Sequence, residues 1–166
     1  MPANTVRPRL RILIAARDNG ICQICGEPVA GDSAKAKRIK PNRIPTLPQG
    51  GEILSGDYPT IDHIYPQLGK TSGEQFIGTD RVYINLALAH KSCNVEKGDL
   101  QPSEKEKRAG LRPINKYVMK KADDAMKALN ITESQITDRA EGRLMFRIIA
   151  QYLANKFTIK SGDFPF

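Results

Sequence analysis

The residues of the sequence that are best suited to metal chemistry are its three cysteines and two histidines. Four of these five form two pairs, Cys22-x-x-Cys25 and His90-x-x-Cys93. Thiolate and imidazole ligands at this spacing suit a tetrahedral Zn²⁺ ion, which binds its ligands at roughly 2.0–2.3 Å. Four protein ligands leave no coordination position open, so we expect a structural zinc site. The alternative, a chance or redox Cys-x-x-Cys pair, does not account for the second pair.

The remaining histidine, His63, directly follows Asp62. Hydrolysis of a phosphodiester needs a positioned water, a base and a cation that neutralises developing charge. An Asp62 carboxylate and an Asn94 carbonyl oxygen are suitable protein ligands for Mg²⁺ or another hard divalent metal, and His63 suits the general base. Adjacent side chains on a strand point to opposite faces, so we expect a bend at or after His63 that brings both residues to one metal.

A further residue, Asn85, is predicted to hold the backbone of the loop and keep His63 directed at its water. Each assignment has a structural alternative. His63 would then be an ordinary core histidine, and Asp62 and Asn94 would serve in turns or caps.

These residues carry a resemblance to a known family. The runs 61–66 (IDHIYP) and 85–98 (NLALAHKSCNVEKG), preceded by 22–26 (CQICG), resemble the HNH endonucleases. The resemblance implies a ββα-metal core in which His63 is the general base, Asp62 and Asn94 hold one catalytic metal and Asn85 braces the loop. It also implies cleavage of DNA to 5′-phosphate and 3′-hydroxyl ends. His90 stands where zinc-bearing members more often have a fourth cysteine.

The elements around these motifs follow from local patterns. We expect a basic helix over 7–18 that ends at Asn19-Gly20, and a strand over 59–66 whose β-branched residues alternate with polar ones. A second strand is predicted over 81–84, followed by a helix from Asn85 to about Lys97 that Gly98 ends.

The C-terminal part is predicted to be helical. Ser103 and Glu106 have capping-box spacing, apolar residues recur at helical intervals from Pro113 to Leu129, and 137–156 repeats this pattern. The fold class is therefore α+β, a ββα-metal core with a zinc knuckle, an N-terminal helix and a helical extension. We expect residues 1–100 to form the core and 101–166 to pack on it, with this helical extension available for DNA binding or, through its last helix, for a homodimer.

The charge balance favours a polyanionic partner, because 26 Lys and Arg residues against 18 Asp and Glu give a net charge of +8. A basic insertion over about 33–58 is either a DNA-contacting arm or a solvated loop. Candidate nucleic-acid contacts in and beyond it are Lys35, Lys37, Arg38, Lys40, Arg43, Lys70 and Lys97. Lys70 and Lys97 are candidates for phosphate contact, with a solvated surface side chain as the alternative.

No run of residues is long and apolar enough for a membrane span, and the N-terminal residues lack the pattern of a signal peptide. An odd number of cysteines argues against a closed disulfide framework, so we expect a cytoplasmic protein. The principal hypothesis is a metal-dependent DNA endonuclease. The rivals are a zinc-stabilised nucleic-acid-binding module without catalysis and a zinc-ribbon protein whose helical tail recruits a partner.

Overall fold

The computed structural model describes residues 6–29, 36–38, 54–56, 59–66, 75–77 and 83–154, with only the backbone for 36–38, 54–56, 77 and 140. Several basic residues predicted to contact nucleic acid, namely Lys35, Lys40, Arg43 and Lys70, lie outside the described residues. Lys37 and Arg38 lie on a described strand, but their side chains are not described. Those predictions therefore stay predictions.

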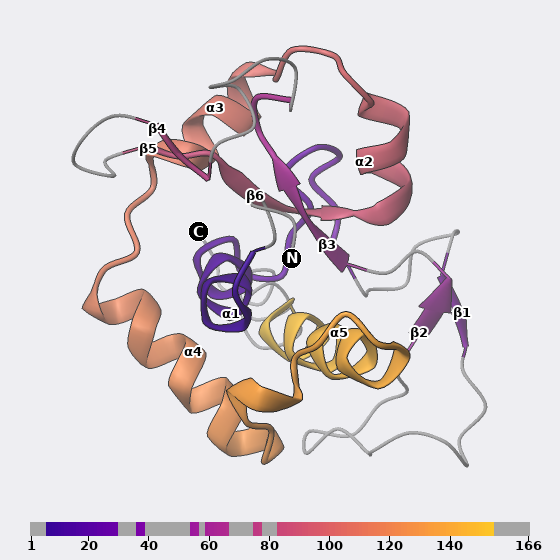
Figure 1. Cartoon of the computed structure of the whole chain (residues 1–166), viewed down its shortest axis with the longest axis vertical. Helices are drawn as coiled ribbons and strands as arrows, with labels where there is room; N and C mark the ends of the chain where they lie inside the picture. The colour runs from indigo at the N-terminus through magenta and orange to yellow at the C-terminus, as the bar shows by residue number, and fades with distance from the viewer. Residues whose placement is uncertain are drawn as a thin grey trace, which may run out of the picture.

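The described residues form five α-helices, one 3₁₀ helix and six short strands (Figure 1). In chain order these are α1 (Pro8–Arg17), β1 (Ala36–Arg38), β2 (Leu54–Gly56), β3 (Pro59–His63), β4 (Phe76–Ile77), β5 (Tyr83–Ile84), β6 (Leu86–His90), α2 (Lys91–Lys97), α3 (Glu104–Leu111), α4 (Lys116–Leu129), η2 (Glu133–Gln135) and α5 (Ala140–Ala154). The strands pair antiparallel as β1–β2, β3–β6 and β4–β5. The architecture is mixed helix and antiparallel strand, as expected for the α+β class.

The pairing of β3 with β6 corrects the prediction for residues 85–97. Leu86–His90 form a strand rather than the first half of a helix, and only α2 (Lys91–Lys97) is helical. All five residues of β6 are buried, so the strand shows no alternation of polar and apolar positions. A continuous apolar run of this length does not distinguish a buried strand from a buried helix. The strand predicted over 81–84 is described only as β5, and it pairs with β4 rather than with β3.

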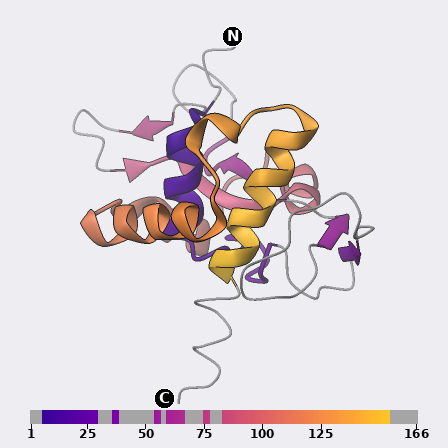
Figure 2. The same ribbon diagram turned by 90° about the horizontal axis from the view of Figure 1, so that it is seen from below.

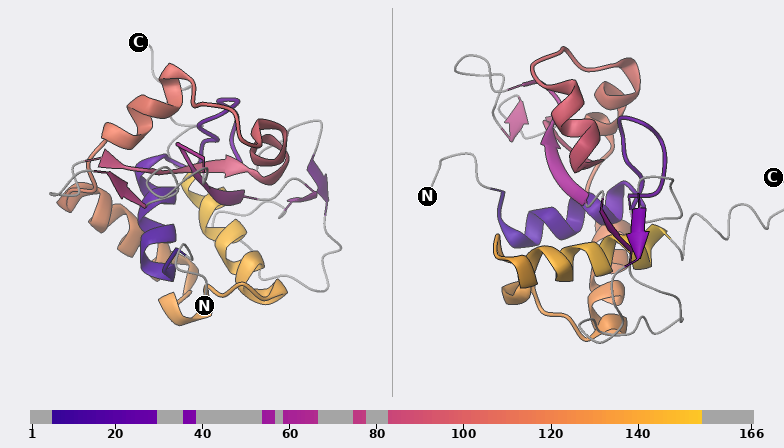
Figure 3. Two further views of the ribbon diagram at one scale, coloured as in Figure 1. Left: turned by 45° about the horizontal axis from the view of Figure 1, so that its top comes forward. Right: turned by 90° about the vertical axis from the view of Figure 1, so that its right-hand side faces the viewer.

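The β3–β6 pair forms the centre of a layered arrangement. Helices α2 and α3 lie on one side of it, and α1 and α5 lie on the other (Figures 1 and 3). Helix α4 packs against α1 and α5 on the outer side of that layer, as the view from below shows (Figure 2). This explains the burial of β6, since helices cover both of its faces.

The helical extension shares one core with the N-terminal helix. Ile12 and Ile14 of α1 lie in the same buried cluster as Val118 of α4 and Ile149 and Leu153 of α5. The region 101–154 therefore holds α1, and through it β6, in position.

Local signals determine where the helices begin and end. Helix α1 has Pro8 in its first turn and is followed by Asn19 and Gly20, both with positive φ. A Cβ atom on Gly20 would lie 2.7 Å from the backbone nitrogen of Ala154, so this turn needs glycine to pack against the end of α5. The predicted capping box of Ser103 and Glu106 begins α3. No helix in the described ranges is long and apolar enough to cross a membrane.

Candidate metal centre and active site

The two predicted ligand pairs come together in one cluster. The ligand atoms of Cys22, Cys25, His90 and Cys93 all lie within 4.8 Å of one another. Sulfur ligands at 2.3 Å from a tetrahedral zinc ion are about 3.7 Å apart, so a small contraction closes the cluster around a metal. The cysteines are free thiols rather than a disulfide. This Cys₃His set can therefore bind a metal such as zinc.

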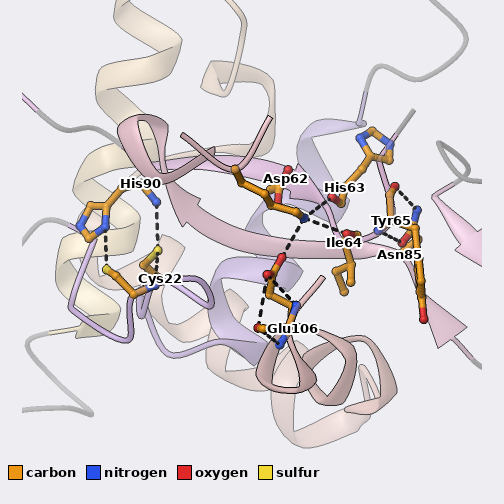
Figure 4. Close-up of polar contacts among 11 residues, drawn as sticks. Cys22, Asp62, His63, Ile64, Tyr65, Asn85, His90 and Glu106 are labelled. Atoms are coloured by element: carbon orange, nitrogen blue, oxygen red, sulfur yellow. Dashed lines mark hydrogen bonds and ion pairs between the residues drawn. The ribbon is translucent and has the colours of Figure 1, made fainter. Parts of the chain in front are cut away.

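The imidazole of His90 is oriented for metal binding (Figure 4). Its Nδ1 atom lies 3.3 Å from the sulfur of Cys25 and 3.7 Å from that of Cys93. Its Nε2 atom lies 3.1 Å from the carbonyl oxygen of Pro28, which only accepts hydrogen bonds. Nε2 therefore carries the proton in the neutral ring, and Nδ1 presents its lone pair to the thiols. An outer hydrogen bond of this kind commonly fixes the tautomer of a metal-ligating histidine.

The electrostatics of the three thiols also favour a cation. Burial by itself raises the pKa of Cys22, but contacts with His90 and hydrogen bonds from backbone N–H groups lower it to about 6. Burial raises the pKa of Cys25, and burial together with the charge of Cys22 raises that of Cys93 to about 12. In the bare cluster one thiolate thus suppresses ionisation of the other two, whereas a divalent cation compensates all three.

The loop that carries Cys22 and Cys25 is tied directly to β6. The backbone N–H of Gln23 donates to the carbonyl of Leu88 at 2.8 Å, and the backbone N–H of His90 donates to the sulfur of Cys22 at 3.4 Å. Gly26 closes the turn with a φ of 83°. The cluster therefore joins the loop that carries Cys22 and Cys25 to the junction between β6 and α2.

A buried ion pair after α1 supports the same strand. Asp18 accepts from the backbone N–H of Leu88 at 2.9 Å and from the guanidinium groups of Arg17 and Arg112 at 2.9 and 2.8 Å. Arg17 also donates to the carbonyl of Leu86 at 2.7 Å. These side chains satisfy the backbone groups on the edge of β6 that does not face β3.

The candidate metal ligand Asp62 lies in a second polar cluster, between β3 and helices α2 and α3. The ammonium of Lys97 lies 2.9 Å from a carboxylate oxygen of Asp62 and 2.7 Å from one of Glu106. It also donates to the carbonyls of His63 and Ile64 at 3.0 and 2.7 Å (Figure 4). Asp62, Lys97 and Glu106 are all buried.

This geometry corrects the prediction for Lys97. Its ammonium is not presented to a phosphate at the surface, because the side chain is 95% buried and the ammonium contacts four oxygen atoms of the protein. Burial nevertheless raises the pKa of Asp62, although Lys97 opposes that shift. Lys97 therefore does not fully offset the cost of burying the charged carboxylate, and a second cation would stabilise its ionised form.

The catalytic candidate His63 faces the opposite side of β3. Pairing with β6 extends through His63, opposite Leu86, and the bend begins only at Ile64. Alternation therefore directs Asp62 toward α2 and α3, while His63 lines a cavity with residues of α1 and α5. Figure 4 shows the imidazole directed away from the cluster around Asp62 and Glu106. The expected bend does not bring the two side chains together.

Asn85 holds the chain immediately after His63. Its side-chain oxygen accepts from the backbone N–H of Tyr65 at 2.8 Å, its amide donates to the carbonyl of the same residue at 3.3 Å, and the side chain is fully buried. Asn94 is half-buried on α2, three residues before Lys97, so the two share the helix face that looks toward β3.

Two contributions were missed from the sequence. Glu106 was assigned only to the capping box, yet its second carboxylate oxygen forms an ion pair with Lys97. Arg11 and Arg143, which line the cavity beside His63, belong to helices whose charges look like ordinary solvated faces. The sequence contained one signal for Glu106, because a capping-box carboxylate has a second oxygen that the cap does not use. It contained no signal for Arg11 and Arg143.

The chain was compared with models of protein families, with curated proteins and with solved structures, and none of them matches it. The residues of the site are therefore the basis for assigning a function.

Replacing one cluster ligand should remove the metal. We expect the purified protein to hold one equivalent of a divalent metal such as zinc, and Cys93→Ser to hold almost none, because three ligands bind the ion much more weakly than four. The free energy of unfolding should fall by about 3 kcal/mol or more. Elemental analysis and urea unfolding measure both. Val95→Ala, at an exposed position of the same helix, is the control, and retention of metal by Cys93→Ser would contradict the assignment.

Removing the buried ammonium should destabilise the fold. Lys97→Met leaves the Asp62 and Glu106 carboxylates buried without their cation, which we expect to lower the free energy of unfolding at pH 7 by about 3–5 kcal/mol. The matched control is Lys120→Met, which alters a lysine exposed on α4 and should change stability little. Equal stability of the two variants would show that the buried pair is not required.

Proposed function

We propose that the protein is a metal-dependent endonuclease of the HNH type that hydrolyses DNA phosphodiester bonds. The observation that carries the proposal most directly is the contact between Asp62 on β3 and the helix that bears Asn94. Lys97 reaches the carboxylate from that helix, and Asn94 lies on the same helix face. Two paired strands followed by a short helix, with oxygen ligands between them, suit one hard divalent cation.

In this proposal each residue of the site has a defined task. The catalytic metal would bind Asp62 and Asn94 and supply charge neutralisation at the attacked phosphate. His63 would take the proton of the attacking water, and Asn85 would hold the backbone that carries His63. The Cys₃His cluster would hold a structural zinc ion that fixes the start of α2. Lys97 would share the Asp62 carboxylate with the metal.

The alternation along β3 constrains the position of the substrate. Because Asp62 and His63 point to opposite sides of the strand, one phosphate would be reached by both only at the strand's C-terminal end, next to the bend at Ile64. DNA is therefore proposed to cross the end of β3.

A second function, a zinc-stabilised nucleic-acid-binding module without catalysis, is favoured by a specific observation. Asp62 already has a protein cation in Lys97, and His63 faces away from it. A structural ion pair and a separate histidine would need no catalytic metal. The net charge of +8 supports DNA as the partner in either case.

A cleavage assay distinguishes the two functions. With Mg²⁺ or Mn²⁺ the wild type should convert supercoiled plasmid to nicked or linear DNA, and His63→Ala should lose at least about 100-fold in rate because the base is missing. Tyr117→Ala, at an exposed position on α4, is the control and should cut normally. Plasmid binding by wild type and His63→Ala without cleavage under any metal would support the binding module instead.

The acid limb of the cleavage rate should reflect the environment of His63. Burial, with a contribution from the Lys97 charge, lowers the pKa of His63 below its ordinary value of 6.5. The imidazole thus stays neutral to lower pH than a free histidine, and kcat/KM should fall only as the pH drops through this lowered pKa. We expect an apparent pKa below 6.5, measured on samples whose metal content is unchanged over the pH range. An acid limb above 6.5 would argue against His63 as the base.

A further inference from the structure

A cavity of about 280 Å³ opens on the side of β3 that faces away from Asp62. It lies between the end of the N-terminal segment, α1, β3 and the start of α5. Its polar lining consists of two guanidinium groups, two threonine hydroxyls, an imidazole and a carboxylate, contributed by Arg11, Arg143, Thr60, Thr137, His63 and Asp138. The volume is near the lower limit of about 300 Å³ for ligand pockets, so it suits a small group rather than a duplex.

The guanidinium of Arg11 is held in place at the cavity wall. It donates to the carbonyl of Val6 at 2.8 Å and to Asp138 at 2.8 Å. The Arg11 side chain is only 18% exposed, whereas that of Asp138 is 70% exposed. An ion pair whose carboxylate is this exposed contributes little, so an incoming anion can compete with Asp138 for Arg11.

The second guanidinium, that of Arg143, has no ion pair among the residues that the structure describes, and it is exposed. The cavity therefore combines two permanent cations with one exposed carboxylate, a net positive site with threonine hydroxyls as neutral donors. Guanidinium groups bind phosphate oxygens through paired, charge-assisted hydrogen bonds.

We propose that this cavity binds a phosphate group of a nucleic-acid strand, through Arg143 and Arg11, beside His63. The proposal deepens the proposed function and rests on it for the identity of the ligand, since inorganic phosphate shares the same chemistry. It assigns substrate binding to α1 and α5, outside the strands and helix that carry Asp62 and Asn94. The nucleic acid would then pass along the α5 side of β3 before it reaches the C-terminal end of β3.

The test is binding of a fluorescent single-stranded DNA oligonucleotide to the zinc-loaded 166-residue protein without added Mg²⁺. Arg143→Gln should weaken binding about tenfold and lower the slope of log K against log salt by about one, because one phosphate contact is lost. Arg139→Gln removes the same charge one turn earlier, outside the cavity lining, and should change binding less than about twofold. Asp138→Asn should strengthen binding, a gain that misfolding does not produce.

NMR signals of the His63 imidazole locate the ligand. They should shift when the oligonucleotide is added to the wild type and not when it is added to Arg143→Gln. Equal losses of oligonucleotide affinity in Arg143→Gln and Arg139→Gln would overturn the proposal and show that diffuse surface charge accounts for the binding. A shift with inorganic phosphate but not with the oligonucleotide would overturn it in favour of an adventitious ion only.

The two proposals fail separately. If the wild type binds through Arg143 but cuts no DNA with any metal, the cavity assignment stands and the endonuclease does not. If the wild type cuts DNA and Arg143→Gln binds it equally well, the endonuclease stands and the cavity assignment is wrong.

Discussion

The antiparallel pairing of β3 with β6 is the constraint on which both polar sites depend. Its register places Asp62 opposite Ala87 and His63 opposite Leu86, and regular pairing leaves no freedom to rotate either side chain to the other face. One face thus receives the carboxylate and its ammonium partner, and the other receives the imidazole and the two guanidinium groups. The outer edge of β6 is satisfied by Arg17 and Asp18, so this two-stranded unit does not depend on further strands to complete its hydrogen bonds.

The contacts of Lys97 explain why so short a helix as α2 is fixed in position. Seven residues form just under two turns in total, which is marginal for an isolated helix. The Cys₃His cluster holds its first turn, and the Lys97 ammonium holds its last turn to β3 and α3. Desolvation of these charges is costly, and the compensation comes from four oxygen partners. The arrangement specifies one orientation of α2, and with it the direction in which Asn94 points.

The sequence predicted elements with strong local signals and missed those that depend on tertiary context. Asn19-Gly20 marked the end of α1, and the spacing of the two ligand pairs marked the cysteine and histidine cluster. Residues 86–90 were misassigned because burial on both faces removes the alternation that identifies a strand. The pairing of Glu106 with Lys97 was not predictable, since α3 meets α2 only through the tertiary fold. The separation of Asp62 from His63 was missed because the bend after His63 leaves both residues in the regular β3–β6 pairing, where neighbouring side chains point to opposite faces.

The position of His90 has a consequence for how the protein could diversify. Its Nε2 atom contacts the carbonyl of Pro28, and in the strand register it lies opposite Pro59. Pro28 and Pro59, which bracket the segment that carries β1 and β2, therefore both lie against His90. Within that segment, the pairing of β1 with β2 brings two parts of the chain together again. A segment whose base is closed in this way can be lengthened, shortened or exchanged with little effect on the fold, because each doubling of loop length costs only about 0.6 kcal/mol in closure entropy. The length and sequence of the chain between these two ends can thus change independently of the core.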